Sequence, residues 1–66
     1  MNSKRLKGKL IEKEMSYNDC AIKLGISITS FCSKINEKTA FKLVEAEKLG
    51  EILNLTDQEK VDIFLS

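Results

Sequence analysis

Residues 16–36 read SYNDCAIKLGISITSFCSKIN and hold the clearest start and stop signals for helices in the chain. Ser16 is a favoured N-terminal cap, and Asp19, three residues later, completes a capping box. Gly25 suits the left-handed conformation in which many helices end, and Ser27 directly supplies another N-terminal cap. The stretch therefore predicts a helix, a tight glycine turn and a second helix.

The apolar residues of this stretch recur at helical spacing, which defines an inward face for each helix. The second helix covers about residues 28–36. A small residue inside the first helix and a glycine in the turn allow two helices to cross closely. The predicted inward residues are Cys20, Ala21, Leu24, Phe31 and Ile35.

Three further helices are predicted outside this stretch, because the chain has no Pro and only three Gly to interrupt them. They cover about residues 3–14, about residues 45–53, and a last segment that begins at a capping box of Thr56 and Glu59. The fold class is therefore all-α with five helices. The expected apolar positions of these three helices are Leu6, Leu10, Ile11, Ala46, Leu49, Leu53, Val61, Phe64 and Leu65.

The segment after the third predicted helix leads to predictions about single residues. Asn36 can adopt the left-handed conformation in place of Gly at the end of that helix. Phe41 and Leu43 look like apolar anchors before the fourth helix. Gly50 inside that helix either lowers its stability or allows another segment to approach closely, and the sequence leaves both open.

Length and composition exclude most classes of enzyme. The chain has 66 residues and a mass of 7.5 kDa, so we expect one domain over residues 1–66 without a separate catalytic lobe. It has no His, and its two Cys lack the spacing of metal motifs. We therefore expect no catalytic residue, no metal, no cofactor and no small-molecule ligand. Unpaired cysteines and the lack of export or membrane signals favour a cytoplasmic protein.

Charge is divided unevenly along the chain, although the net charge is only +1. Residues 1–44 carry nine basic and four acidic side chains, a net charge of +5, whereas residues 45–66 carry two basic and six acidic ones, a net charge of −4. Such asymmetry is a sign of an anionic partner for one part of the surface. An uneven but merely solvated surface explains the charges equally well.

The run LGISxxSFxSKIN, at residues 24–36, is followed by Phe41, Leu43 and the segment ExEKLGEILNL that ends at Leu55. This pattern resembles the Cro/CI-type helix-turn-helix proteins of phages and bacteria, the XRE-like family, in their short stand-alone phage form. The resemblance extends from Leu6 to Phe64. It implies a lambda-repressor-like bundle of five helices and a sequence-specific DNA-binding transcriptional regulator.

The resemblance also implies which residues contact DNA. Tyr17 stands where the family usually has Gln, and Glu37 stands where it usually has Gly. The implied base contacts lack Arg, Gln and Asn, the side chains that form most bidentate pairings. The base contacts are Ile28, Thr29, Cys32 and Ser33, and the phosphate contacts are Tyr17, Asn18, Lys34, Asn36, Lys38 and Lys42.

The implied partner is double-stranded DNA carrying a pseudo-palindromic operator, bound by a homodimer. We expect the acidic C-terminal third to point away from the duplex. Apolar residues near the C-terminus exceed what one short helix needs, which suggests a two-fold interface. A protein-interaction module of the antirepressor kind is the alternative, because the third helix is poor in donors. The residues offered for the interface are Leu55, Val61, Ile63, Phe64 and Leu65.

Overall fold

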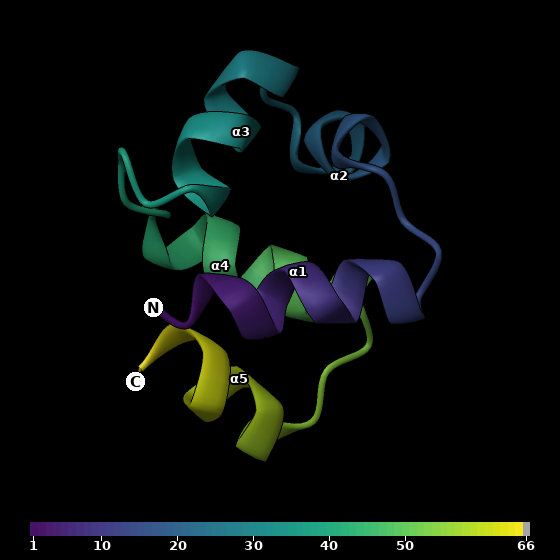
Figure 1. Cartoon of the computed structure of the whole chain (residues 1–66), viewed down its shortest axis with the longest axis vertical. Coiled ribbons are helices and arrows are strands. Elements are labelled where there is room, and N and C mark those ends of the chain that lie inside the picture. The colour runs from purple at the N-terminus through teal and green to yellow at the C-terminus, as the bar shows by residue number, and fades with distance from the viewer. Residues whose placement is uncertain (66) are drawn as a thin grey trace.

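The computed structural model describes residues 1–65, and its regular structure is entirely helical (Figure 1). The all-α prediction with five helices is therefore confirmed over these residues. Helix α3 begins at the predicted residue, and the other boundaries lie within a few residues of their predicted places. The helices are α1 (Ser3–Glu12), α2 (Tyr17–Leu24), α3 (Ile28–Ile35), α4 (Leu43–Ile52) and α5 (Asp57–Phe64).

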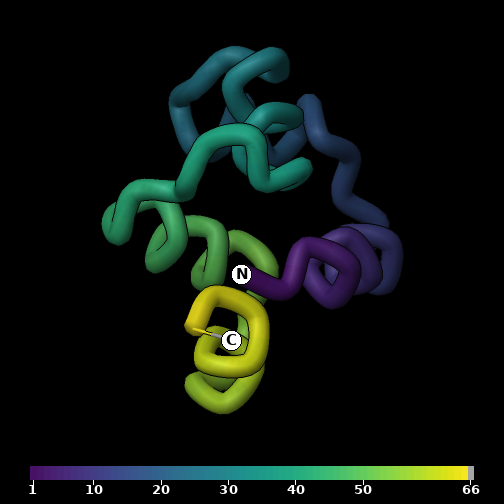
Figure 2. Tube along the Cα trace, turned by 60° about the vertical axis from the view of Figure 1, so that its left-hand side comes forward, coloured from purple at the N-terminus to yellow at the C-terminus, as the bar shows by residue number. Residues whose placement is uncertain are grey.

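Helices α2 and α3 form one end of the molecule and α5 the other, with α1 and α4 between them (Figures 1 and 2). Helix α2 packs against α3 and α4, and α1 packs against α3 and α5. Figure 1 shows α2 nearly end-on and α3 from the side, so the two cross steeply. The acidic α5 therefore lies far from the end formed by α2 and α3.

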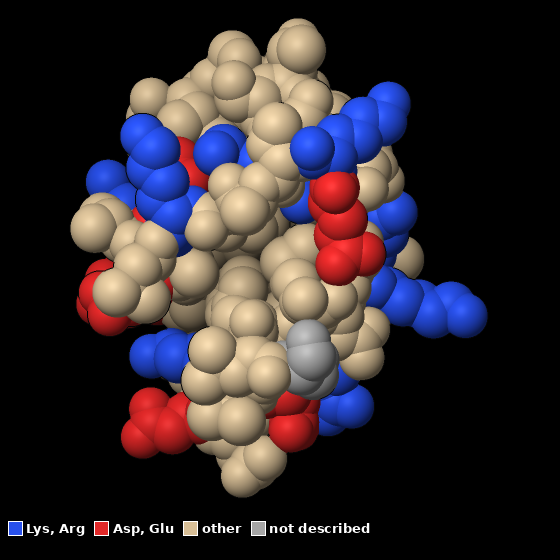
Figure 3. Space-filling model, turned by 90° about the vertical axis from the view of Figure 1, so that its left-hand side faces the viewer, with Lys and Arg blue, Asp and Glu red and all other residues tan. Residues whose placement is uncertain are grey.

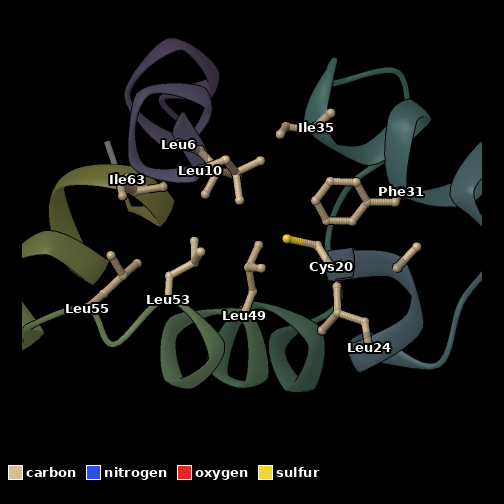
Figure 4. Packing of buried hydrophobic residues seen from close by; sticks show 11 residues of the cluster. Leu6, Leu10, Cys20, Leu24, Phe31, Ile35, Leu49, Leu53, Leu55 and Ile63 are labelled. Atoms are coloured by element: carbon tan, nitrogen blue, oxygen red, sulfur yellow. The ribbon is translucent and has the colours of Figure 1, made fainter. Parts of the chain in front are cut away.

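All five helices and the segment before α5 contribute to one apolar core (Figure 4). An aromatic row runs through it, because the ring of Phe31 lies 5.6 Å from that of Tyr17 and 5.9 Å from that of Phe41. The ring centroids of Phe41 and Phe64 are in turn 6.2 Å apart. The buried residues are Leu6, Leu10, Cys20, Ala21, Leu24, Phe31, Ile35, Leu49, Leu53, Leu55 and Ile63.

The helices begin where the sequence predicts caps. The Ser16 hydroxyl accepts from the backbone N–H of Asp19 at 3.0 Å, and the Asp19 carboxylate accepts from the N–H of Ser16 at 3.1 Å. Ser27 caps α3, and Thr56 with Glu59 forms the second predicted box. Each such cap contributes about 1 kcal/mol, so these short helices owe much of their position to them.

The first four helices all end in the same turn, with one residue in the left-handed conformation. Gly25 fills this position after α2 as predicted, at φ 74°. After α3 the left-handed residue is Glu37, at φ 61°, whereas Asn36 has φ −90°; the prediction for Asn36 was wrong by one residue. In each turn the next N–H donates to the carbonyl five residues back, at 2.8–3.0 Å. The left-handed residues are Glu14, Gly25, Glu37 and Asn54.

Several predicted core positions are wrong. Helix α4 begins at Leu43 rather than at residue 45, and this places Leu43 on the surface with 75% of its side chain exposed. Ile11 is 79% exposed, and Ala46 is only half-buried. Leu43 lies in the first turn of α4 on its exposed side, whereas Leu49 and Leu53 are buried as predicted. Ile11 directly follows the buried Leu10, and one residue along a helix turns the side chain by about 100°, away from the buried face. Phe41 does pack against the core as an anchor.

Gly50 is buried, and the side chain packed against it accounts for the absence of a Cβ atom at this position. A Cβ atom at this position would lie 2.8 Å from Cε of Lys60, whose aliphatic chain crosses α4 there. Of the two interpretations of Gly50, close approach is the one the structure supports. Within residues 1–65, no helix combines the length and apolar character that crossing a membrane demands.

Candidate functional site

The first turn of α3 is the uncovered part of this helix. Phe31 and Ile35 are fully buried and fix the helix against the core, while Ile28 is 46% exposed. Thr29 is exposed as well, but Cys32 is only half-buried. Of the four residues predicted to contact bases, Ile28 and Thr29 therefore project freely. Cys32 and Ser33 lie one turn on and are partly covered.

Two predicted phosphate contacts lie at the start of α2, and they differ in exposure. Asn18 is exposed in the first turn, where free backbone N–H groups favour an anion. Tyr17 is half-buried, because its ring packs against Phe31. A hydrogen bond from the Ser16 backbone N–H lowers the pKa of Asp19, which keeps this carboxylate ionised within the cap.

Lys34 is held inside the molecule rather than presented to solvent. Its Nζ atom lies 3.1 Å from Oε1 of Glu45 and donates to the carbonyl of Ala40 at 3.2 Å. Only 14% of the Lys34 side chain is exposed. The pKa of Glu45 is lowered, first by a hydrogen bond from the Lys42 backbone N–H and further by Lys34. The pair thus ties α3 to the start of α4.

Asn36 is also engaged by other residues. Its Oδ1 atom accepts from Nζ of Lys7 at 2.8 Å, and its Nδ2 atom donates to the carbonyl of Cys32 at 2.9 Å. The sequence interpretation did not assign Lys7 to this region, since 29 residues separate the two along the chain. The packing of α1 on α3 brings Lys7 to the end of α3, where it adds a positive charge.

Lys38 and Lys42 are exposed, and no ion pair to either is found within residues 1–65. Lys38 occupies the position directly after the left-handed residue of α3. In the other three turns this position holds an apolar residue packed on the core: Met15, Ile26 or Leu55. The fold therefore does not need a lysine at position 38.

Much of the positive charge of α1 is paired with acidic residues. Lys9 forms ion pairs with Glu59 of α5 and with Glu12, the latter at 3.1 Å. Arg5 lies 3.7 Å from Asp62 of α5. Residues 1–15 have a net charge of +3, from five basic and two acidic side chains, and residues 16–44 add +2, from four and two. The surplus available to a partner is smaller than the sequence suggests.

A hollow of about 470 Å³ lies between the segment after α3, the start of α4 and the C-terminal end of α5. Figure 3 shows the face that contains this region, a largely uncharged band with charged groups along its edges. Leu43 and Leu65 border the hollow with 75% and 79% of their side chains exposed. Its apolar lining is Met1, Ala40, Phe41, Leu43, Ala46, Phe64 and Leu65.

The structure also changes the predicted dimer surface. Leu55 and Ile63 are 8% and 0% exposed, so they belong to the core of the single chain. They are therefore not available for an interface, and this part of the prediction was wrong. Phe64 and Leu65 remain accessible beside the hollow, and Val61 is 47% exposed.

Comparison with curated proteins and with solved structures gives no match. One family model does match the chain, and the match covers residues 1–66. A match over this length shows membership, so the chain belongs to the family described as "Protein of unknown function (DUF739)".

Proposed function

We propose that this chain is a DNA-binding transcriptional regulator similar to the Cro/CI-type helix-turn-helix proteins. In this proposal α2 lies across the phosphate backbone and α3 enters the major groove. Two copies bind the two halves of a pseudo-palindromic operator, with their α3 helices about 34 Å apart. The acidic α5 then faces away from the duplex.

The observation that carries the proposal is that the first turn of α3 is exposed and that the turn after α3 holds an exposed lysine which the fold does not require. Ile28 and Thr29 are exposed in the first turn of α3, and α3 lies with α2 at the end of the molecule opposite α5 (Figure 1). Lys38 is exposed at a position where three equivalent turns hold apolar residues. Lysines of this kind supply phosphate contacts, which dominate the affinity of proteins for DNA.

Exposure supports a division among the proposed phosphate contacts. Lys38, Lys42 and Asn18 are exposed, so we assign them the direct contacts. Lys34 and Asn36 hold neighbouring segments through the bonds described above, and we assign them the role of fixing the loop that carries Lys38.

A mobility-shift titration of the full chain tests the proposal. The probe is the duplex from the intergenic region beside its own gene, with a shuffled duplex of equal composition as control. We expect submicromolar binding to the native probe at low salt, weakening steeply as salt rises. Binding that does not respond to salt, or none below micromolar protein, contradicts the proposal.

We assign the second copy in the dimer to the hollow. Each chain offers both a cavity of about 470 Å³ and exposed leucines at its rim, Leu43 and Leu65. A two-fold axis brings the rim of one copy to the cavity of the other, as an interface between identical surfaces requires.

Two neighbouring residues provide a matched test of this interface. Leu43 and Val44 are exposed to similar extents, 75% and 71%, but only Leu43 is among the residues lining the hollow. We expect Leu43→Asp to shift sedimentation equilibrium toward the monomer and Val44→Asp to leave it unchanged. Equal behaviour of the two variants, or a monomeric parent chain at high micromolar concentration, contradicts the assignment.

The alternative function is a protein-interaction module of the antirepressor kind. The observation that favours it is the apolar character of the surface of α2 and α3, where Ile22 is 69% exposed and Ile28 is 46% exposed. Lys34, the one basic residue of α3, is already paired with Glu45. Stable association with a second regulator, together with no retention on DNA, supports this alternative.

A further inference from the structure

The exposed first turn of α3 has an unusual side-chain inventory for a surface that reads bases. Ile28, Thr29 and Ser30 offer methyl groups and hydroxyls and carry no amide, guanidinium or carboxylate. Lys34 is directed to Glu45 and to the carbonyl of Ala40. The helix therefore lacks a side chain with two hydrogen-bonding groups in a fixed geometry.

The major groove limits what such side chains can recognise. Guanine is usually read by Arg or Lys, and adenine by the paired groups of Asn or Gln. A hydroxyl both donates and accepts, so Thr29 and Ser30 bond to several bases with little discrimination. The C5-methyl group of thymine is the apolar feature of the groove, and Ile and Thr can contact it through their own methyl groups.

We infer that this chain selects its DNA chiefly by thymine methyl groups, contacted by Ile28 and by Cγ2 of Thr29. This inference rests on the proposed function and specifies the class of duplex bound. Ile28 is the principal contact, because it is the larger apolar side chain of this turn and 46% of the residue is exposed, which leaves it partly rather than fully free. A partly held side chain loses less conformational entropy when it binds. Thr29 is the second contact, since it lies beside Ile28 and is exposed.

The first experiment separates methyl readout from all other contacts. Duplexes that bind the full chain are selected from a library with a random core, and each selected thymine is then replaced singly by deoxyuridine. This change removes one methyl group and keeps the hydrogen-bonding edge and the phosphates. We expect at least one position per half-site at which affinity falls about fourfold, the value of one buried methyl group.

The second experiment assigns the contact to residues by fluorescence anisotropy. Thr29→Ser removes one methyl group and keeps the hydroxyl, so it is the matched variant at that position. We expect Ile28→Ala to abolish the preference for thymine over deoxyuridine at one position, and Thr29→Ser at another. Ile22→Ala is the control, because Ile22 is 69% exposed but lies on α2. Thermal unfolding by circular dichroism checks that each variant is folded.

The outcomes distinguish this inference from the function on which it rests. If no duplex is retained from the library, both fail. If duplexes are retained but deoxyuridine binds as well as thymine at every position, the chain binds DNA and only the methyl readout is wrong. A preference for thymine that survives in both Ile28→Ala and Thr29→Ser overturns the assignment to α3.

Discussion

Two regions of this molecule use similar basic residues in different ways. Where α1 packs on α5, Lys9 and Arg5 are paired with Glu59 and Asp62 and join two helices. Around α3, among the residues the structure describes, Lys34 forms such an ion pair, with Glu45. Lys38 is exposed and occupies a position that the fold elsewhere gives to apolar residues.

Net charge along the sequence is therefore a poor measure of the charge offered to a partner. Part of the basic N-terminal segment is neutralised by the acidic C-terminal helix that folds against it. A small set of lysines near α3 remains exposed, and the proposed function depends on them.

Both regions rest on one apolar core, and we expect Phe31→Ala to unfold that core. The Phe31 ring is fully buried and contacts Tyr17 and Phe41. Such a truncation costs about 3–5 kcal/mol, while a chain of this size has about 3–10 kcal/mol in total. We expect most of the helical signal in circular dichroism to be lost at 37 °C. Ile28→Ala on the same helix is the control and should remain folded.

The turns after α1 and after α2 should respond in opposite directions to matched changes. Gly25 and Glu14 both have positive φ, 74° and 56°. We expect Gly25→Ala to lower the free energy of unfolding by about 1 kcal/mol and Glu14→Gly to raise it by a similar amount, because a Cβ atom strains this conformation. Urea denaturation measures both. The same sign for the two variants would show that the turns are not equivalent.

Removing an unpaired cation should affect DNA binding more than removing a paired one. We expect Lys38→Ala to weaken binding to all duplexes about fivefold near physiological salt and to reduce the salt slope by about 0.9, as for one lost phosphate contact. Arg5→Ala, which removes the ion pair with Asp62, should change binding less than twofold. Equal losses of affinity in the two variants would contradict the proposed difference between exposed and ion-paired basic residues.

The smallest effect concerns the acid sensitivity of the contact between α1 and α5. A hydrogen bond from Lys9 and another from the Thr56 backbone lower the pKa of Glu59 from 4.5 to about 2. The stabilisation is therefore complete above pH 4.5 and is lost as the pH falls toward 2. Glu59→Gln keeps an acceptor for the capping box but removes the charge. Its melting temperature should fall less than that of the parent chain between pH 4.5 and pH 2, and Glu51→Gln should behave like the parent.

The parts of the fold that depend on local chemistry could be predicted from the sequence. Ser16 with Asp19, Gly25 and Ser27 each act within a few residues, so their types alone indicate where α2 ends and α3 begins. Residue type alone assigned the left-handed position after α3 to Asn36, because Asn is the more usual choice, whereas it is Glu37, which stands where the resembled family usually has Gly. The start of α4 was also missed, since Lys42 is not a usual cap and the capping interaction comes from Glu45.

The candidate site was less predictable, because tertiary contacts decide which side chains are free. Nothing in the sequence shows that Lys34 pairs with Glu45, or that Lys7 reaches Asn36 from another helix. Residue type and helical register were sufficient to predict that Ile28 and Thr29 are exposed. They were not sufficient for Cys32 and Ser33, which adjacent segments partly cover.

The repeated turn at the ends of α1 to α4 has a consequence for folding kinetics. Each turn closes hydrogen bonds over only five residues, and most helices also begin at a cap made by a neighbouring side chain. Such local signals form before distant segments meet, and helical proteins with mainly local contacts fold in microseconds to milliseconds. The sequence contains no Pro, whose isomerisation delays the refolding of many proteins. We therefore expect this chain to refold within milliseconds of a transient opening, with no slow phase from proline isomerisation.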